Sequence, residues 1–185
     1  CKINDQHFIV TTTTGGAAKV LFDMEEYAQT EWPHLNVYLN SITEQFSTFN
    51  ISGPKSRAIM RKVFSDVDFS NDKFPFMSFK KVNYLDTEVR ILRASFTGEL
   101  GYEVYVTPKY GLELWEKFFR YGENLGLIPY GTETMHLLRA EKGYIVVGQD
   151  TDGTVTPLDL NLNWMIGKNK KDFIGKRSLS RSDTS

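Results

Sequence analysis

Two segments near the middle of the chain, residues 79–96 and 101–106, carry the clearest repeating pattern in the sequence. Apolar residues alternate with other residues along them: Val89, Ile91, Tyr102, Val104 and Val106. Successive side chains of a β-strand point to opposite faces, so this alternation is typical of strands with one buried face. We therefore expect a hairpin or a bulged pair of strands here, interrupted at Gly98 and Gly101.

Helical segments surround these strands. Apolar residues at three- and four-residue spacing predict helices over residues 17–28, after Gly53-Pro54, from Thr107-Pro108 to Gly126, and over residues 132–142. The apolar stripe of the third helix is predicted to comprise Leu112, Trp115, Phe118 and Phe119. Further strands are expected over residues 7–14 and within residues 37–51. Because strands and helices do not alternate steadily, the pattern predicts an α+β fold with a largely antiparallel sheet.

Length and composition limit the classes of protein to which the chain can belong. Its 185 residues fit one domain, which we assign to residues 1–176, with 177–185 as a linker or disordered tail. The chain begins with Cys1 and enters a strand-like run within a few residues, so we expect an N-terminally truncated domain. A net charge of −1 argues against a nucleic-acid partner.

The cysteine count and the hydropathy pattern bear on where such a chain would act. The one cysteine allows no internal disulfide, and no apolar run is long enough to cross a bilayer. We therefore expect a cytoplasmic protein without a membrane partner. The three histidines are scattered and the cysteine is alone, so no metal site is predicted.

The segment Thr97–Glu103 is the first candidate for a binding site. Its two glycines let the backbone turn sharply around Glu99 and could hold this carboxylate rigidly. A fixed carboxylate accepts two parallel hydrogen bonds, so it complements a ring with adjacent amino and N–H donors. The alternative is a glutamate that faces solvent from an ordinary turn, and the residues alone favour it.

Arg139 is the second candidate, because it follows two leucines on a predicted helix and could reach from that helix into a cleft. Its planar guanidinium suits a carboxylate or carbonyl group of a ligand. An ordinary ion pair with a nearby acid explains it equally well.

Two motifs, in this order, resemble the glycine-cleavage T-protein family, the folate-dependent aminomethyltransferases: TGELGYE at 97–103 and LRAEKG at 138–143. Other segments resemble the alpha subunits of heterotetrameric sarcosine oxidases: residues 7–16, 29–33, 147–157 and 171–177. The resemblance covers nearly the whole chain, and several motifs in the expected order are more specific than one.

The resemblance implies an α+β folate-binding fold and a role in one-carbon transfer. In this chemistry a flavin oxidises the methyl group of sarcosine to an imine, whose carbon passes to tetrahydrofolate. The products are 5,10-methylenetetrahydrofolate, glycine and hydrogen peroxide. Glu99 matches the family's pterin-binding glutamate and Arg139 its arginine near the folate, so both are expected to bind the cofactor. Tyr102 and Tyr144 have no firm assignment.

The resemblance also implies what must lie elsewhere. The family's catalytic aspartate precedes the strand with which this chain begins, so the catalytic residue is unknown here and we expect the isolated segment to be inactive. FAD, FMN and NAD are expected in other regions or subunits, and the beta, gamma and delta subunits of a sarcosine oxidase are the expected partners.

Two other functions remain open. The same fold could bind folate or dock subunits without transferring carbon. It could also belong to a related folate-dependent demethylase or dimethylglycine oxidase.

Overall fold

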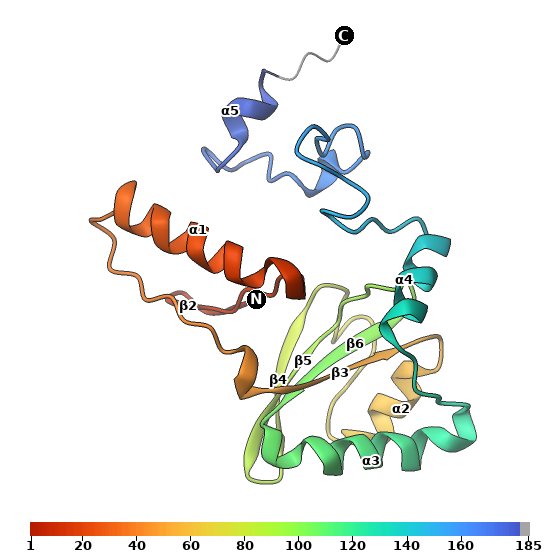
Figure 1. Cartoon of the computed structure of the whole chain (residues 1–185). Helices are drawn as coiled ribbons and strands as arrows, with labels where there is room; N and C mark the ends of the chain where they lie inside the picture. The colour runs from red at the N-terminus through yellow and green to blue at the C-terminus, as the bar shows by residue number, and fades with distance from the viewer. Residues whose placement is uncertain (182–185) are drawn as a thin grey trace.

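The computed structural model describes residues 1–181, and its centre is a four-stranded antiparallel sheet with the strand order β3-β6-β5-β4. The strands are β3 (Ser47–Ser52), β4 (Phe79–Tyr84), β5 (Thr87–Leu92) and β6 (Gly101–Val106). Two helices, α2 (Ser56–Val63) and α3 (Gly111–Gly122), lie together below the sheet in Figure 1. The predicted α+β class and antiparallel sheet are therefore confirmed.

The remaining elements are peripheral. A short hairpin of β1 (Lys2–Asn4) and β2 (His7–Phe8) precedes α1 (Ala17–Thr30). After α3 come α4 (Thr132–Glu141), a long irregular segment and α5 (Lys176–Leu179). Single 3₁₀ turns cover Thr14–Gly16, Thr43–Gln45, Pro108–Tyr110, Glu123–Leu125 and Asn163–Met165. Figure 1 shows α1 and the C-terminal segment extending away from the sheet on its far side from α3.

Alternation along the strands separates a buried face from an open one, as the sequence predicts. Tyr102, Val104 and Val106 of β6 are fully buried, whereas Glu103 and Tyr105 between them are only half-buried. The buried face packs on α2 and α3 through aromatic contacts: Phe49 with Phe118, Phe64 with Tyr84, and Tyr102 with Phe69 and Phe74. Antiparallel sheets commonly bury one face only.

The hydrophobic core lies within a short stretch of the chain. Every buried hydrophobic side chain among residues 1–181 falls between Ile51 and Phe118. Helix α1 has no buried residue, although Val20, Leu21 and Tyr27 are half-buried on its predicted apolar face. The folded centre is therefore smaller than the domain predicted over residues 1–176.

Two predicted strands are shorter in the structure. The run at residues 7–14 forms a strand only at His7–Phe8, and the region 37–51 does so only from Ser47. Ile9 still bonds Cys1 through its N–H and its carbonyl, and beyond it the remaining residues of the first run pair with no strand of the described chain. β-branched composition indicates a strand only where a partner is present.

The apolar stripe of α3 was predicted only in part, because Phe118 is buried as expected but Leu112 and Trp115 are exposed. Leu114 and Phe118 face the core, whereas Leu112 is 71% exposed and Trp115 is 44% exposed. The helix begins at Gly111, whose own position is buried against Ser47, and this sets which face turns inward.

The structure describes only part of the C-terminal tail predicted at residues 177–185. Residues 177–179 of the predicted tail lie in α5, and 182–185 lie outside the described residues, so the boundary at 176 stays a prediction. Among residues 1–181, no helix combines the length and the apolar character needed to cross a membrane.

We expect Leu114→Ala to lower the free energy of unfolding by about 2–5 kcal/mol, because it opens a cavity beneath the sheet. Leu112→Ala makes the same change on the exposed side of the same helix and should change stability by less than about 0.5 kcal/mol. Urea denaturation of the two variants measures both values. Equal losses would contradict the assigned orientation of α3.

Candidate functional site

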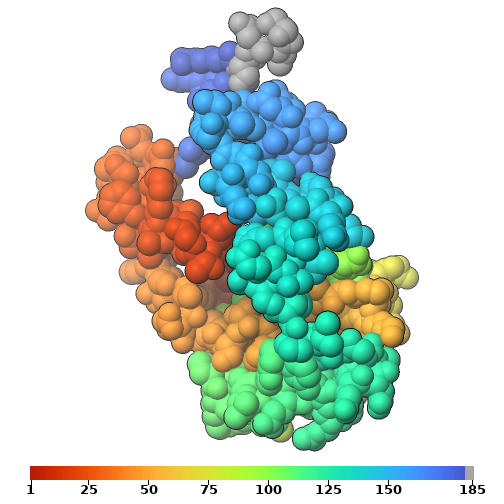
Figure 2. Space-filling model, turned by 45° about the vertical axis from the view of Figure 1, so that its right-hand side comes forward, coloured from red at the N-terminus to blue at the C-terminus, as the bar shows by residue number. Residues whose placement is uncertain are grey.

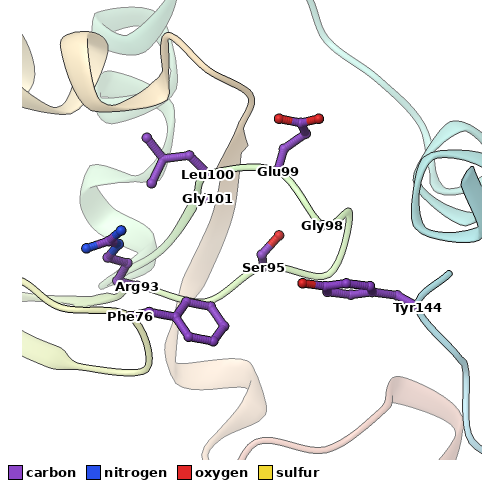
Figure 3. Close-up of a pocket in the computed structure, with 8 residues that line it drawn as sticks. All are labelled: Phe76, Arg93, Ser95, Gly98, Glu99, Leu100, Gly101 and Tyr144. Carbon is purple, nitrogen blue, oxygen red and sulfur yellow. The ribbon is translucent and has the colours of Figure 1, made fainter. Parts of the chain in front are cut away.

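A pocket opens at the end of the sheet where β5 passes through a loop into β6 (Figure 3). It has a volume of about 280 Å³, close to the lower end of the range for small-molecule sites. Its walls are formed by Phe76, Arg93, Ser95, Gly98, Glu99, Leu100, Gly101 and Tyr144. Figure 3 shows the Tyr144 ring reaching toward Ser95 from a separate part of the chain. The pocket therefore joins the loop before β6 to the segment after α4.

The turn that carries Glu99 is fixed by the start of α2. The carbonyl of Leu100 accepts hydrogen bonds from the Gly53 N–H at 2.8 Å and from the Ser56 hydroxyl at 3.0 Å. Ser56 is itself buried. On the other side of Glu99, Gly98 has a φ of +76°, a left-handed conformation that favours glycine. These constraints hold the Glu99 backbone in one place, as the sequence predicts for a turn with two glycines.

The Glu99 side chain forms an ion pair with Lys142. The Lys142 ammonium lies 2.7 Å from Oε1 of Glu99, and this hydrogen bond raises the pKa of Lys142. The Glu99 side chain is 36% exposed, so its carboxylate lies at the surface rather than in the core, and Figure 3 draws it on the other side of the turn from Ser95. The carboxylate can accept further hydrogen bonds, because a carboxylate has about four lone-pair sites.

Two polar groups of the pocket lack a partner within the described chain. The Ser95 hydroxyl and the Nε of Arg93 are both buried and make no hydrogen bond there. Arg93 is held through Nη1, which donates to the carbonyl of Phe74 at 2.5 Å. Buried polar groups are normally satisfied, so these two atoms are unusual among the residues that line the pocket.

Arg139 does not line the pocket. It is 7% exposed in α4, and its guanidinium forms an ion pair with Asp150 and donates from Nη1 to the Tyr144 carbonyl at 3.0 Å. The Arg139 hydrogen bond, followed by one from the Val146 N–H, lowers the pKa of Asp150. Arg139 thus fixes the segment that brings Tyr144 to the pocket, and its predicted contact with a cofactor stays a prediction.

The two tyrosines without an assignment lie in different places. Tyr102 is fully buried in the core, where its hydroxyl accepts a hydrogen bond from Nε of Arg57 at 3.2 Å. Tyr144 lines the pocket. Sequence reasoning missed Phe76, Arg93 and Ser95, since no motif marks them, and it gave no role to Lys142 of the LRAEKG motif. Within residues 1–181, His, Cys, Asp and Glu side chains form no group of three that could hold a metal ion.

We predict that Gly98→Ala destabilises the protein more than Gly126→Ala. Both glycines have nearly the same φ, +76° and +77°, so an added Cβ strains both backbones by about 1–2 kcal/mol. Only at Gly98 would the Cβ meet another group, the Cβ and Cγ of Lys142 at 2.6 Å. Urea denaturation compares the two variants, and equal losses would show that Lys142 does not pack on Gly98.

We also predict that Asp150→Asn loosens the segment after α4, because it removes the carboxylate that holds Arg139 and the Val146 N–H. Hydrogen exchange at the Val146 amide should accelerate by about tenfold or more. The matched control is Asp152→Asn, since the Asp152 carboxylate bonds Thr154 within its own turn. Unchanged exchange in Asp150→Asn would argue against this role of the ion pair.

Comparison with known proteins shows relatives along nearly the whole chain. The alpha subunit of sarcosine oxidase from Corynebacterium sp. (strain P-1) is 52% identical over 184 residues, which are 98% of this chain and 19% of that subunit. The corresponding subunit from Rhizobium meliloti (strain 1021) is 40% identical over 182 residues, 97% of this chain and 18% of the subunit. An aminomethyltransferase from Halothermothrix orenii (strain H 168 / OCM 544 / DSM 9562) is 38% identical over 137 residues, 74% of this chain and 38% of that enzyme.

The chain thus spans about a fifth of the length of the sarcosine oxidase subunits that it matches. The family model described as the GCVT N-terminal domain matches residues 1–170. These matches confirm the resemblance drawn from TGELGYE and LRAEKG, and the chain belongs to the GCVT N-terminal domain family.

Proposed function

We propose that this chain is the tetrahydrofolate-binding part of a sarcosine oxidase alpha subunit and that the pocket at Glu99 receives the pterin ring. The observation that carries the proposal is the placement of Glu99 on a fixed turn at the rim of an open pocket. A carboxylate held in this way complements the adjacent amino group and ring N–H of a pterin.

Other groups of the pocket suit the same ligand. The unpartnered Ser95 hydroxyl and the Arg93 Nε can bond the polar edge of the ring, and the Phe76 and Tyr144 side chains offer aromatic surface. In this proposal Arg139 serves the cofactor indirectly, because it holds the carbonyl of Tyr144. Arg139 then needs no direct contact with folate.

We further propose the reaction of the whole protein from its relatives, which bear the name sarcosine oxidase subunit alpha. Sarcosine would be demethylated oxidatively, and its one-carbon unit would pass to tetrahydrofolate to give 5,10-methylenetetrahydrofolate, glycine and hydrogen peroxide. FAD, FMN and NAD would bind in other regions or subunits of the parent protein. The beta, gamma and delta subunits would be its partners, and the cytoplasm its location.

In the same proposal this chain alone does not complete the transfer. A folate nitrogen that attacks an iminium carbon needs a nearby group to manage its proton, and such help is worth about 10² to 10⁴ in rate. The pocket contains one carboxylate, Glu99, and we assign it to the ring. We therefore expect the isolated chain to bind folate without transferring carbon.

A second candidate, a subunit-assembly module, is favoured by the apolar surface outside the core. Large hydrophobic side chains are more than half exposed in both peripheral regions: Phe8, Val10, Phe22, Leu35, Val37, Tyr38, Ile128, Val147, Trp164, Met165 and Ile174. Exposed apolar groups in such number suit contact with other protein. This function is compatible with folate binding, because the pocket lies at the end of the sheet.

The proposal is tested by calorimetric titration of the full chain with folinic acid, a stable tetrahydrofolate derivative. We expect saturable binding that Glu99→Gln weakens by about ten- to a hundredfold, because the amide offers a donor where the ring also offers donors. The control is Glu103→Gln, which changes the neighbouring glutamate of the same motif. Glu103 accepts a hydrogen bond from Tyr105 and does not line the pocket.

Absence of binding by the folded wild-type chain would refute the folate assignment. Equal losses in Glu99→Gln and Glu103→Gln would place the ligand elsewhere.

A further inference from the structure

One edge of the central sheet has no partner strand within residues 1–181. β3 is the first strand in the order β3-β6-β5-β4 and pairs only with β6. We propose that its free edge is a strand-pairing site, occupied by an extended apolar strand of the same parent polypeptide from outside this chain. The inference concerns another surface than the pocket at Glu99 and does not depend on folate binding.

The register of β3 with β6 determines which backbone groups face the free edge. The Gly53 N–H donates to the Leu100 carbonyl at 2.8 Å, and these two residues continue the β3–β6 register. Because bonded and non-bonded pairs alternate along an antiparallel ladder, every second residue before Gly53 bonds β6 and the others direct their N–H and C=O groups outward. The outward groups are those of Thr48, Asn50 and Ser52. No backbone hydrogen bond among the described residues reaches them.

The sequence of β3 lacks the features that usually keep an edge strand from pairing. Natural edge strands are commonly protected by lysine, proline or a bulge. β4, at the opposite edge of the sheet, carries Lys80 and Lys81. β3 contains neither a charged residue nor a proline, and its register with β6 runs without a bulge. The composition of β3 therefore suits pairing with a further strand better than contact with water.

An apolar strip of α3 lies beside this edge, and it consists of Leu112, Trp115 and Phe119 (Figure 1). The Phe49 ring of β3 lies 6.0 Å from the Trp115 ring, and Trp115 lies 4.7 Å from Phe119, both measured between centroids. Trp115 is 44% exposed and Leu112 is 71% exposed. A strand paired with β3 would cover this strip with every second side chain, because alternate side chains of a strand share a face.

The backbone edge and the apolar strip together specify the chemistry of the occupant. The edge requires an extended segment, and the strip requires apolar side chains at alternate positions of that segment. Charged side chains on that face would lose water without gaining a partner. The occupant is thus an amphipathic or fully apolar strand rather than a helix or a charged peptide.

The length of the relatives assigns this strand to the same polypeptide. The matched residues make up only 19% of the sarcosine oxidase alpha subunit from Corynebacterium sp. (strain P-1), so most of a protein of that length lies outside them. A strand tethered to the same chain also pairs at a high effective concentration, whereas a separate molecule loses more freedom on binding.

Hydrogen exchange along β3, measured residue by residue in the isolated chain and in the purified parent protein, tests whether the edge is occupied. In the isolated chain the three outward amides should exchange about a hundredfold faster than the inward amides of Phe49 and Ile51. In the parent protein the outward amides should slow by a similar factor. Outward amides that exchange equally fast in both proteins would overturn the proposal.

Two matched substitutions test the apolar strip. Leu112→Ala should leave the urea midpoint of the isolated chain almost unchanged but lower the melting temperature of the parent protein by about 2 °C or more. The control is Leu85→Ala, because Leu85 is similarly exposed, at 67%, and lies between β4 and β5 at the opposite edge of the sheet. It should leave both values unchanged. Equal shifts for the two variants in the parent protein would argue against the strip.

A photo-crosslinking amino acid in place of Thr48, which is exposed, identifies the occupant in the parent protein. We expect mass spectrometry to find the crosslink on a segment of the same polypeptide outside this chain. A crosslink to another subunit, or to β3 of a second copy, would overturn the assignment. None of these results depends on folinic acid, so failure of the folate site and failure of this inference are distinguishable.

Discussion

The carbonyl of Leu100 is the point at which the candidate site is attached to the folded core. It accepts hydrogen bonds from the Gly53 N–H and the Ser56 hydroxyl, both at the junction of β3 and α2. Because β3 pairs with β6 along its whole length, this junction and the start of β6 are held together by the sheet. The turn before β6 therefore takes its position from the core, and Glu99 takes its position from the turn.

The pocket depends on a second, weaker attachment. Tyr144 and Lys142 come from the end of α4, outside the segment that contains the buried core. Their place is set by the Arg139–Asp150 ion pair and by the hydrogen bonds between Arg139 and Tyr144. One wall of the pocket is thus held by the sheet, and the other is held by the ion pair and hydrogen bonds of Arg139. A ligand that contacts both walls would be stabilised by both and would link them (Figure 3).

Figure 2 shows the N-terminal and C-terminal regions as separate lobes above the compact centre. Both regions expose large apolar side chains, and the chain spans about a fifth of its sarcosine oxidase relatives. Such surface is costly to leave in water, because each square ångström of apolar area contributes roughly 25 cal/mol when buried. The peripheral regions thus have the character of contact surfaces, whereas the centre has the character of a folded core.

Much of the centre could be predicted from local pattern. The alternation within residues 79–96 and 101–106 and the two glycines around Glu99 predict the strands and the turn, because both depend on short-range geometry. Residues 7–14 show the limit of such reasoning, since β-branched residues form a strand only where a partner strand pairs with them. Leu112 and Trp115 show another, because the inward face of α3 depends on where Gly111 meets the sheet.

In the candidate site, too, local pattern predicts some residues, and contacts between distant parts of the chain determine others. Glu99 could be found from its motif, but Ser95 and Arg93 could not, because no motif marks them. LRAEKG contains Lys142, but the motif does not reveal its contact with Glu99 in a distant part of the chain. For Arg139 the sequence left an ion pair and a ligand contact equally open. The structure shows the ion pair with Asp150, a partner that spacing alone does not identify.

The most direct test of the central claim is a crystal structure of the full chain with folinic acid. The account predicts the pterin ring in the pocket at the end of the sheet, with its amino group and ring N–H within hydrogen-bond distance of the Glu99 carboxylate and Lys142 still bound to Oε1. A ring bound elsewhere, or a Glu99 carboxylate turned away from it, would contradict the account.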